Sequence, residues 1–129
     1  MATSLPELAQ RLIDAPTFPT IATVNADASP QASVIWVKRD GTDILFSTVR
    51  GRRKTRNMER EPRVSLVVVN PDNPYNYVEI RGTVTLDDAG GKELIDELSV
   101  KYTGQPYTED GPDVVRVVCR LTPEHVTGM

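Results

Sequence analysis

A short polar segment near the middle of the chain combines the residue types that hold a phosphate group. Two hydroxyl side chains, Ser47 and Thr48, end an apolar run, and Gly51 follows shortly after them. Arg52 and Lys54 would then supply a planar fork and a point charge within one helical turn. A helix that begins here would direct its free backbone N–H groups and positive dipole end to the same place. The segment therefore predicts an anion site.

The uneven distribution of charge bears on this interpretation. The 129 residues include 15 Lys and Arg and 18 Asp and Glu, for a formal net charge of −3. Residues 50–63 alone hold seven basic and two acidic side chains, a net charge of +5, so the remainder carries −8. A charge run on a short helix is commonly only its solvated face. Its concentration in an acidic chain, directly after a strand, favours a ligand site.

Other familiar constellations are missing from the sequence. His125 is the one histidine and has no cysteine or carboxylate at ligand spacing, so no metal site is expected. Acidic pairs such as Asp87-Asp88 fall in turns, where they commonly cap and solvate. No nucleophile-elbow, P-loop or dinucleotide-binding motif occurs. Cys119 lies in an apolar run and is predicted to be a core residue.

The elements that must position the basic segment are mostly strands. Strands are predicted over residues 21–24, 32–38, 44–46, 64–69, 77–86 and 114–121, and helices over residues 5–13, within 50–62, and over 94–102. Asp87 or Asp88 is expected to open the last helix and Gly104 to close it. The first three strands should form a meander through two short turns. The pattern predicts a single mainly β domain over residues 1–129, a closed or nearly closed antiparallel barrel of six strands with three short helices.

Several motifs along nearly the whole chain resemble the split β-barrel flavin and deazaflavin oxidoreductases related to pyridoxamine 5′-phosphate oxidase. They lie at residues 20–24, 30–33, 47–48, 52–57, 61–65, 77, 81–84 and 123–126, and 52–57 is the most specific. The likeness is greatest to a short actinobacterial branch that uses coenzyme F420, a deazaflavin with a phosphate and an oligoglutamate tail. The resemblance implies an FMN-binding-like split β-barrel and a homodimer with two cofactor sites at the subunit interface.

The resemblance also implies which residues bind the cofactor. The full set is Gln31, Val34, Trp36, Ser47, Thr48, Arg50, Arg52, Arg53, Lys54, Asn57, Tyr75 and Tyr77. Within it, Arg52 and Lys54 would bind the phosphate and the two hydroxyl residues would add contacts. Residues 31–36 would pass beside the ring, and the two tyrosines would come from the other subunit. Arg50 and Arg53, together with Arg56, would contact the anionic tail.

The implied function is hydride transfer from reduced F420 to an electron-poor small molecule such as an enone or lactone. The cofactor supplies the hydride in such an enzyme, so the lack of a catalytic triad is no argument against catalysis. Two alternatives stay open: an FMN-binding oxidase or reductase that uses the same phosphate site, and a carrier of a flavin or deazaflavin that does not turn over.

Composition limits the remaining partners and the location. A pI of about 5.1 and the absence of aromatic residues within the basic segment argue against nucleic-acid binding. No run of residues is long and apolar enough to cross a bilayer, and no secretory signal is seen at the start. With its single cysteine, the chain is expected to be cytoplasmic.

Overall fold

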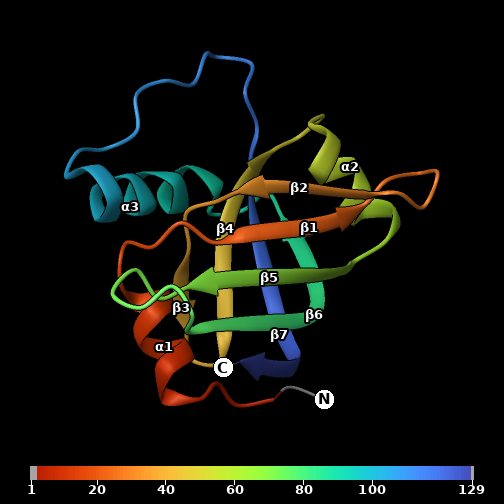
Figure 1. Cartoon of the computed structure of the whole chain (residues 1–129). Coiled ribbons are helices and arrows are strands. Elements are labelled where there is room, and N and C mark those ends of the chain that lie inside the picture. The colour runs from red at the N-terminus through yellow and green to blue at the C-terminus, as the bar shows by residue number, and fades with distance from the viewer. Residues whose placement is uncertain (1–2, 129) are drawn as a thin grey trace.

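The computed structural model describes residues 3–128, which are built around one antiparallel sheet (Figure 1). The strands are β1 (Thr20–Val24), β2 (Pro30–Val34), β3 (Lys38–Asp40), β4 (Asp43–Val49), β5 (Arg63–Val69), β6 (Tyr77–Asp87) and β7 (Arg116–Gly128). The helices are α1 (Glu7–Asp14), α2 (Arg53–Arg60) and α3 (Gly91–Thr103). The prediction of a mainly β antiparallel protein with three short helices is confirmed.

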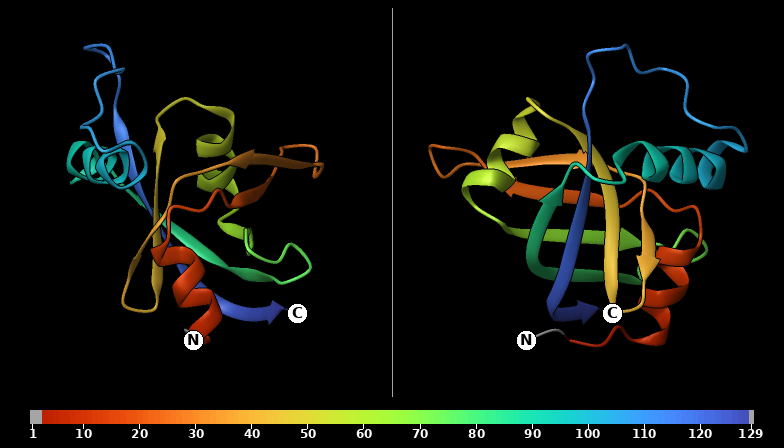
Figure 2. Two further views of the ribbon diagram at one scale, coloured as in Figure 1. Left: turned by 60° about the vertical axis from the view of Figure 1, so that its left-hand side comes forward. Right: turned by 180° about the vertical axis from the view of Figure 1, so that it is seen from behind.

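The sheet is curled but is not closed into a barrel. Its strand order is β2-β1-β5-β6-β7-β4-β3, and all neighbouring pairs are antiparallel. Figure 2 shows α1 at one end of the curled sheet and α2 and α3 at the other. Strands β2 and β3 lie at opposite edges, and no ladder joins them within residues 3–128. The prediction of a closed or nearly closed barrel of six strands is therefore wrong: residues 3–128 form seven strands, in a sheet that is not closed.

Residues 35–37 account for this difference. The sequence pattern predicts that they lie inside one strand over residues 32–38. In the structure the amide of Ile35 donates to the carbonyl of Pro19 at 3.0 Å, and that of Val37 donates to the Tyr102 hydroxyl at 3.1 Å. These amides are satisfied outside any ladder, so the strand is interrupted and the chain crosses to the other edge. The predicted meander is wrong for the same reason, because β2 pairs only with β1 and β3 only with β4.

Strand β6 matches its predicted range to within one residue, whereas β7 differs from the prediction. Strand β7 begins two residues after the predicted start and continues beyond residue 121, because β6 pairs with it as far as Gly128. A register shift between Arg81 and Gly82 lets Pro123 lie within this ladder, although proline has no N–H to donate. The long pairing of β6 and β7 joins the two halves of the curled sheet.

Apolar side chains inside the curl form the main core. Phe46, Leu66 and Leu121 are fully buried there, and Ile13 of α1 covers one end. Cys119 is also fully buried in this cluster, which confirms its prediction as a core residue. A smaller cluster packs α3 against β4, through Leu45, Leu94 and Leu98 with Trp36 beside them. Two of its members, Leu98 and Trp36, line the site described below.

Glycine residues determine where the two helices near this cluster begin. Gly51 precedes α2 with a φ of 95°, a backbone conformation that residues with a Cβ rarely adopt. At the first residue of α3, Gly91, a Cβ would lie 2.1 Å from the Arg116 carbonyl oxygen, so only glycine allows this approach to β7. The predicted opening of this helix by an aspartate is wrong: Asp87 accepts from the amide of Ala89 at 2.9 Å, one turn earlier. None of the helices within residues 3–128 has the length and apolar character needed to span a membrane.

Candidate functional site

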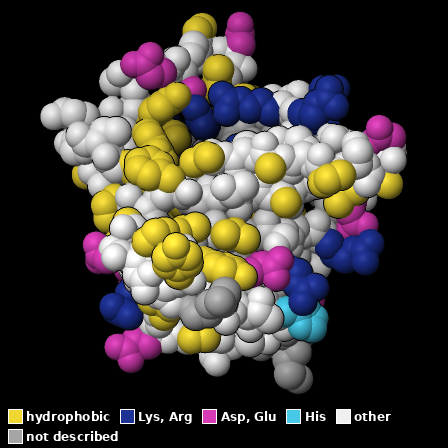
Figure 3. Space-filling model, viewed as in Figure 1, with side chains coloured by type: hydrophobic (Ala, Val, Ile, Leu, Met, Phe, Trp, Pro, Cys, Tyr) yellow, Lys and Arg dark blue, Asp and Glu magenta, His cyan; other side chains and the backbone are white. Residues whose placement is uncertain are grey.

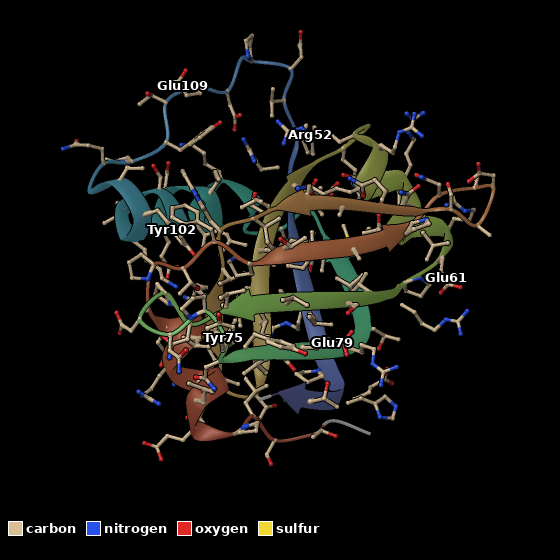
Figure 4. The ribbon with its side chains drawn as sticks, in the orientation of Figure 1. Arg52, Glu61, Tyr75, Glu79, Tyr102 and Glu109 are labelled. Carbon is tan, nitrogen blue, oxygen red and sulfur yellow. The ribbon has the colours of Figure 1, made fainter. Side chains whose placement is uncertain are left out.

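A pocket of about 190 Å³ lies between the start of α2, the crossover at residues 35–37, and α3. It is lined by Val34, Ile35, Trp36, Ser47, Arg52, Lys54, Ile95, Leu98, Tyr107 and Arg116. One side is apolar and aromatic and the other is basic. Figure 4 shows Arg52 at the upper end of the molecule, next to the loop at residues 104–115 that carries Glu109. The structure thus brings together five of the predicted site residues: Val34, Trp36, Ser47, Arg52 and Lys54.

The start of α2 is fixed to the end of β4 by buried hydroxyl groups. The hydroxyl oxygens of Thr48 and Thr55 lie 2.9 Å apart, and Thr55 also donates to the carbonyl of Val49 at 2.7 Å. Thr48 is fully buried, so this predicted ligand-binding residue does not line the pocket. Its hydroxyl instead holds the helix that presents Arg52 and Lys54.

Three cations line the pocket, and one of them is paired with a carboxylate. Lys54 Nζ donates to Ser33 Oγ at 3.3 Å, and within residues 3–128 neither Lys54 nor Arg52 forms an ion pair. Burial lowers the pKa of Lys54, and the charge of Arg52 lowers it further. The third cation, Arg116, is paired with Asp110. The resulting excess of positive charge attracts an anion.

Arg116 was not predicted to be a site residue. Its Nε and Nη2 donate to the Asp110 carboxylate at 2.8 and 2.9 Å, and its guanidinium lies 4.8 Å from the centre of the Tyr107 ring. Burial is the largest single influence and lowers the pKa of Arg116, but the hydrogen bonds and the charge of Asp110, together with Tyr107, outweigh it and raise the pKa. The signal in the sequence was one of two arginines, Arg116 and Arg120, inside the apolar run at residues 114–121. No motif marks Tyr107, which comes from the adjoining loop.

Trp36 and Tyr107 supply the aromatic part of the pocket lining, and Tyr107 also lies against the cation Arg116. The ring of Trp36 stacks on that of Tyr102, with centroids 5.2 Å apart and planes inclined by 12°. Tyr107 meets Trp36 edge-on at 6.4 Å. Trp36 lies in the crossover at residues 35–37. The interruption of the predicted strand therefore also places the indole ring in the pocket lining. A planar ligand is well matched to such a lining.

Two of the predicted residues belong to a polar network beside the pocket. The side-chain nitrogen Nδ2 of Asn57 donates to the hydroxyl of Thr23 and to Oδ1 of Asn25, each at 3.0 Å. Thr23 in turn donates to Gln31 at 2.6 Å. Asn57 is buried, and this network joins α2 to β1 and β2. Neither Gln31 nor Asn57 lines the pocket.

The remaining predicted arginines lie on the outer surface of α2 or just before it. Arg50 is paired with Glu59 at 2.8 Å and with Asp88 at 2.9 Å. Arg53 and Arg56 are exposed and form no ion pair within the described part of the chain. Figure 3 shows Lys and Arg side chains gathered along the upper edge, over α2 and beside a hydrophobic patch.

The two predicted tyrosines lie far from the pocket of their own subunit. Tyr75, in the loop before β6, is 84% exposed, and Tyr77 begins β6. Figure 4 shows Arg52 in the upper part of the molecule and Tyr75 well below it, beside the sheet. Any contact of these tyrosines with a ligand in such a pocket would therefore have to come from another copy of the chain.

Comparison with known proteins identifies the family. The sequence model for pyridoxamine 5′-phosphate oxidase matches residues 5–129. The chain belongs to the pyridoxamine 5′-phosphate oxidase family. A solved structure named F420 reductase is 32% identical, with a TM-score of 0.85, and the match covers 95% of this chain and 98% of that one. The resemblance drawn from the sequence is thereby confirmed.

Two more distant structures share the fold. A conserved hypothetical protein from Mycobacterium tuberculosis has 20% identity and a TM-score of 0.79, with 98% of this chain and 85% of that chain covered. A Listeria innocua protein named for pyridoxamine 5′-phosphate oxidase has 21% identity and a TM-score of 0.72, with 92% and 93% covered. At these identities the likeness shows the split-barrel fold alone.

The pocket of this member of the pyridoxamine 5′-phosphate oxidase family fits the cofactors of an oxidoreductase family. A guanidinium, an ammonium and a hydroxyl converge on one side, which suits a phosphate group. The indole of Trp36 on the other side suits a flat ring system. The donor set and the aromatic lining together fit a flavin or a deazaflavin.

Proposed function

We propose that this protein is an F420-dependent oxidoreductase that transfers a hydride to an electron-poor small molecule. The observation that carries the proposal is the excess of cations on one side of an aromatic pocket. The 32% identity to a structure named F420 reductase supports this choice of cofactor. When bound, the deazaflavin ring supplies the hydride, and the protein supplies binding and orientation.

The roles of the pocket residues follow from their chemistry. Arg52 and Lys54 bind the phosphate by charge-assisted hydrogen bonds, and Ser47 adds a hydroxyl contact. Trp36, supported from behind by Tyr102, orients the ring. Leu98 and its apolar neighbours exclude water from that side. The proposal assigns no acid or base to a side chain.

Exposed cations outside the pocket support F420 over FMN. Both cofactors carry a phosphate, but only F420 carries a chain of carboxylates. Arg53 and Arg56 continue from Arg52 along the exposed side of α2 and have no ion-pair partner among residues 3–128. They would bind an anionic tail, which the acidic remainder of the chain would repel. Arg50 is already held by two carboxylates and would contribute less.

FMN remains a second candidate because the family match itself favours it. An FMN enzyme would use the same phosphate contacts and leave the exposed arginines of α2 without a ligand. A carrier that binds either cofactor without turnover would also use the same pocket. The three functions differ in which cofactor binds and in whether the bound cofactor reacts.

A second copy of the chain would complete this site. The volume of about 190 Å³ is below the roughly 300 Å³ at which pockets begin to enclose a drug-sized ligand. The outer face of β2, β1, β5 and β6 exposes Val34 (62%), Val69 (45%) and Tyr77 (37%). Exposed apolar side chains grouped on one sheet face mark an interface. We therefore propose a homodimer through this face, in which Tyr75 and Tyr77 approach the partner's cofactor.

A paired titration tests the proposed function. Purified protein is titrated with oxidised F420 and, separately, with FMN, and binding is followed by fluorescence. We expect tight binding of F420, whereas tight binding of FMN with none of F420 would overturn the proposal. In a separate assay, cofactor-free protein is mixed with reduced F420 and a panel of enones and lactones. Oxidation of F420 is expected, and tight binding without any oxidation would identify a carrier.

A further inference from the structure

The guanidinium of Arg116 is placed to serve two partners at once. Its side chain is only 8% exposed, although it lines the pocket. Nε and Nη2 are taken by Asp110, while Nη1 reaches Ser47 Oγ only at the long distance of 3.4 Å. A buried cation held on one edge by its carboxylate therefore directs its other edge to the pocket.

We propose that Arg116 is a third anion-binding residue of the pocket, and that through Asp110 it holds the loop at residues 104–115 beside the bound anion. The inference rests on the proposed function, because the ligand is taken to be a phosphate-bearing cofactor. It adds a residue from β7, far along the chain from the basic segment that the sequence marks. Ser47, on the neighbouring strand β4, shares the same side of the pocket.

The loop has a second anchor, on α3. The amide of Tyr107 donates to the Asp96 carboxylate at 3.0 Å, and the Tyr107 ring lies against the Arg116 guanidinium. Arg116 is thus the point at which the loop, β7 and the pocket meet. Its Asp110 partner brings negative charge close to a bound anion, so Asp110 weakens anion binding while Arg116 strengthens it.

Two substitutions separate this role from a purely structural ion pair. Asp110→Asn and Arg116→Gln both break the pair and loosen the loop, but only Arg116→Gln removes a cation. Arg116→Lys keeps the charge and loses the planar fork. Arg120→Gln is a matched control, since Arg120 lies on the same strand and is paired with Asp40 and Asp43, each at 3.0 Å.

The experiment measures the affinity of each folded variant for F420 and for FMN. We expect Arg116→Gln to weaken binding by roughly tenfold, Arg116→Lys to weaken it less, and Arg120→Gln to leave it unchanged. Asp110→Asn should leave the affinity unchanged or raise it. Equal weakening by Asp110→Asn and Arg116→Gln would overturn the inference, because the pair would then act only on the fold. An unchanged affinity in Arg116→Gln would overturn it as well.

Inorganic phosphate separates failure of this inference from failure of the proposed function. If the wild-type protein binds neither cofactor, the proposed function fails. The Nε–H resonance of Arg116, assigned by its absence in Arg116→Gln, can still be followed as phosphate is added to the wild-type protein. We expect it to shift together with the signal of Lys54. A shift of Lys54 alone would exclude Arg116 from the anion site.

Discussion

Thr48 and Thr55 join the end of β4 to the first turn of α2 through hydroxyl oxygens that lie 2.9 Å apart in the protein interior. Thr55 has one hydroxyl hydrogen and donates it to the Val49 carbonyl at 2.7 Å, so Thr48 is the donor of the pair. Two hydrogen bonds in series thus fix the helix that carries Arg52 and Lys54. The proposed phosphate-binding geometry therefore depends on a contact that contains no charge.

Replacement of Thr55 by valine tests this dependence. Thr55→Val keeps the shape of the side chain but leaves the Thr48 hydroxyl and the Val49 carbonyl without their partner. We expect a loss of about 1–3 kcal/mol in the free energy of unfolding, measured in urea, and weaker cofactor binding. Thr55→Ser retains the hydroxyl and is the control. An unfolding midpoint of Thr55→Val equal to that of the wild type would contradict this account.

Removal of either cation at the start of α2 tests the phosphate site directly. Arg52→Ala and Lys54→Ala should each lower cofactor affinity by about one to two decades, since a charge-assisted contact contributes roughly 1.5–3 kcal/mol. Little change in stability is expected, because neither side chain forms an ion pair within residues 3–128. Arg11→Ala, on the exposed side of α1, is the control for a lost surface charge. Normal affinity in both variants would mean that the basic segment is only a solvated face.

Local patterns in the sequence were sufficient for most of the fold. The apolar run around Cys119 correctly placed this residue in the core, and the basic helix lies within the predicted range of residues 50–62. The pattern of residues 32–38 could not show that the strand is interrupted at residues 35–37. The partners of those amides are Pro19 and the hydroxyl of Tyr102, which is 65 residues away from Val37. Pairings over such distances leave no periodic signal.

The same distinction between local and long-range contacts applies to the residues of the candidate site. Ser47, Arg52 and Lys54 lie close together in the chain, and their spacing alone indicated an anion site. Arg116 and Tyr107 reach the pocket only because β7 pairs with β4 and because the loop before β7 folds back onto α3. Thr48 and Asn57 carry the right chemistry at the right spacing, but the fold uses both to hold α2. Sequence spacing does not distinguish a group that binds a ligand from one that positions its neighbour.

The close approach of α3 to β7 gives a prediction about Gly91. A Cβ at this residue would lie 2.1 Å from the Arg116 carbonyl oxygen, so Gly91→Ala must displace the helix that carries Ile95 and Leu98. We expect a loss of about 1–3 kcal/mol in stability, measured in urea, and weaker cofactor binding. Gly111→Ala, where a Cβ would meet nothing within 4 Å, should leave both unchanged. Wild-type stability in Gly91→Ala would contradict the packing described here.

The proposed dimer predicts that association and cofactor binding are lost together. Val69→Lys places a charge on the exposed face of β5, at a residue that does not line the pocket and is 45% exposed in the single chain. We expect the variant to run as a monomer in analytical ultracentrifugation and to bind F420 more weakly than the wild type. Val100→Lys, at a residue of α3 that is 49% exposed, controls for an added surface charge. A wild-type protein that remains monomeric across all concentrations would disprove the dimer.

Lys101 gives a prediction about pH. Its ammonium donates to the carbonyls of Ile13 at 2.7 Å and Val37 at 2.6 Å, and so holds the crossover that carries Trp36. Burial lowers the pKa of Lys101 to about 8, with Asp14 opposing and Lys38 adding to the shift. An unfolded lysine keeps its proton to a pKa near 10.4. Between these values the unfolded chain binds more protons, so the contribution of Lys101 to the free energy of unfolding rises with pH.

The measurement compares the wild-type protein with Lys101→Met by urea unfolding from pH 7 to pH 10. The wild type should gain stability relative to the variant as the pH rises through this window, because the cost of burying a charged ammonium is removed as the proton leaves. The neutral amine keeps two N–H groups, so both carbonyls can retain their donor. Direct titration of the Lys101 side chain by NMR should have its midpoint near pH 8. A midpoint close to that of an exposed lysine, with a constant difference in stability between the two proteins, would refute the buried-charge account.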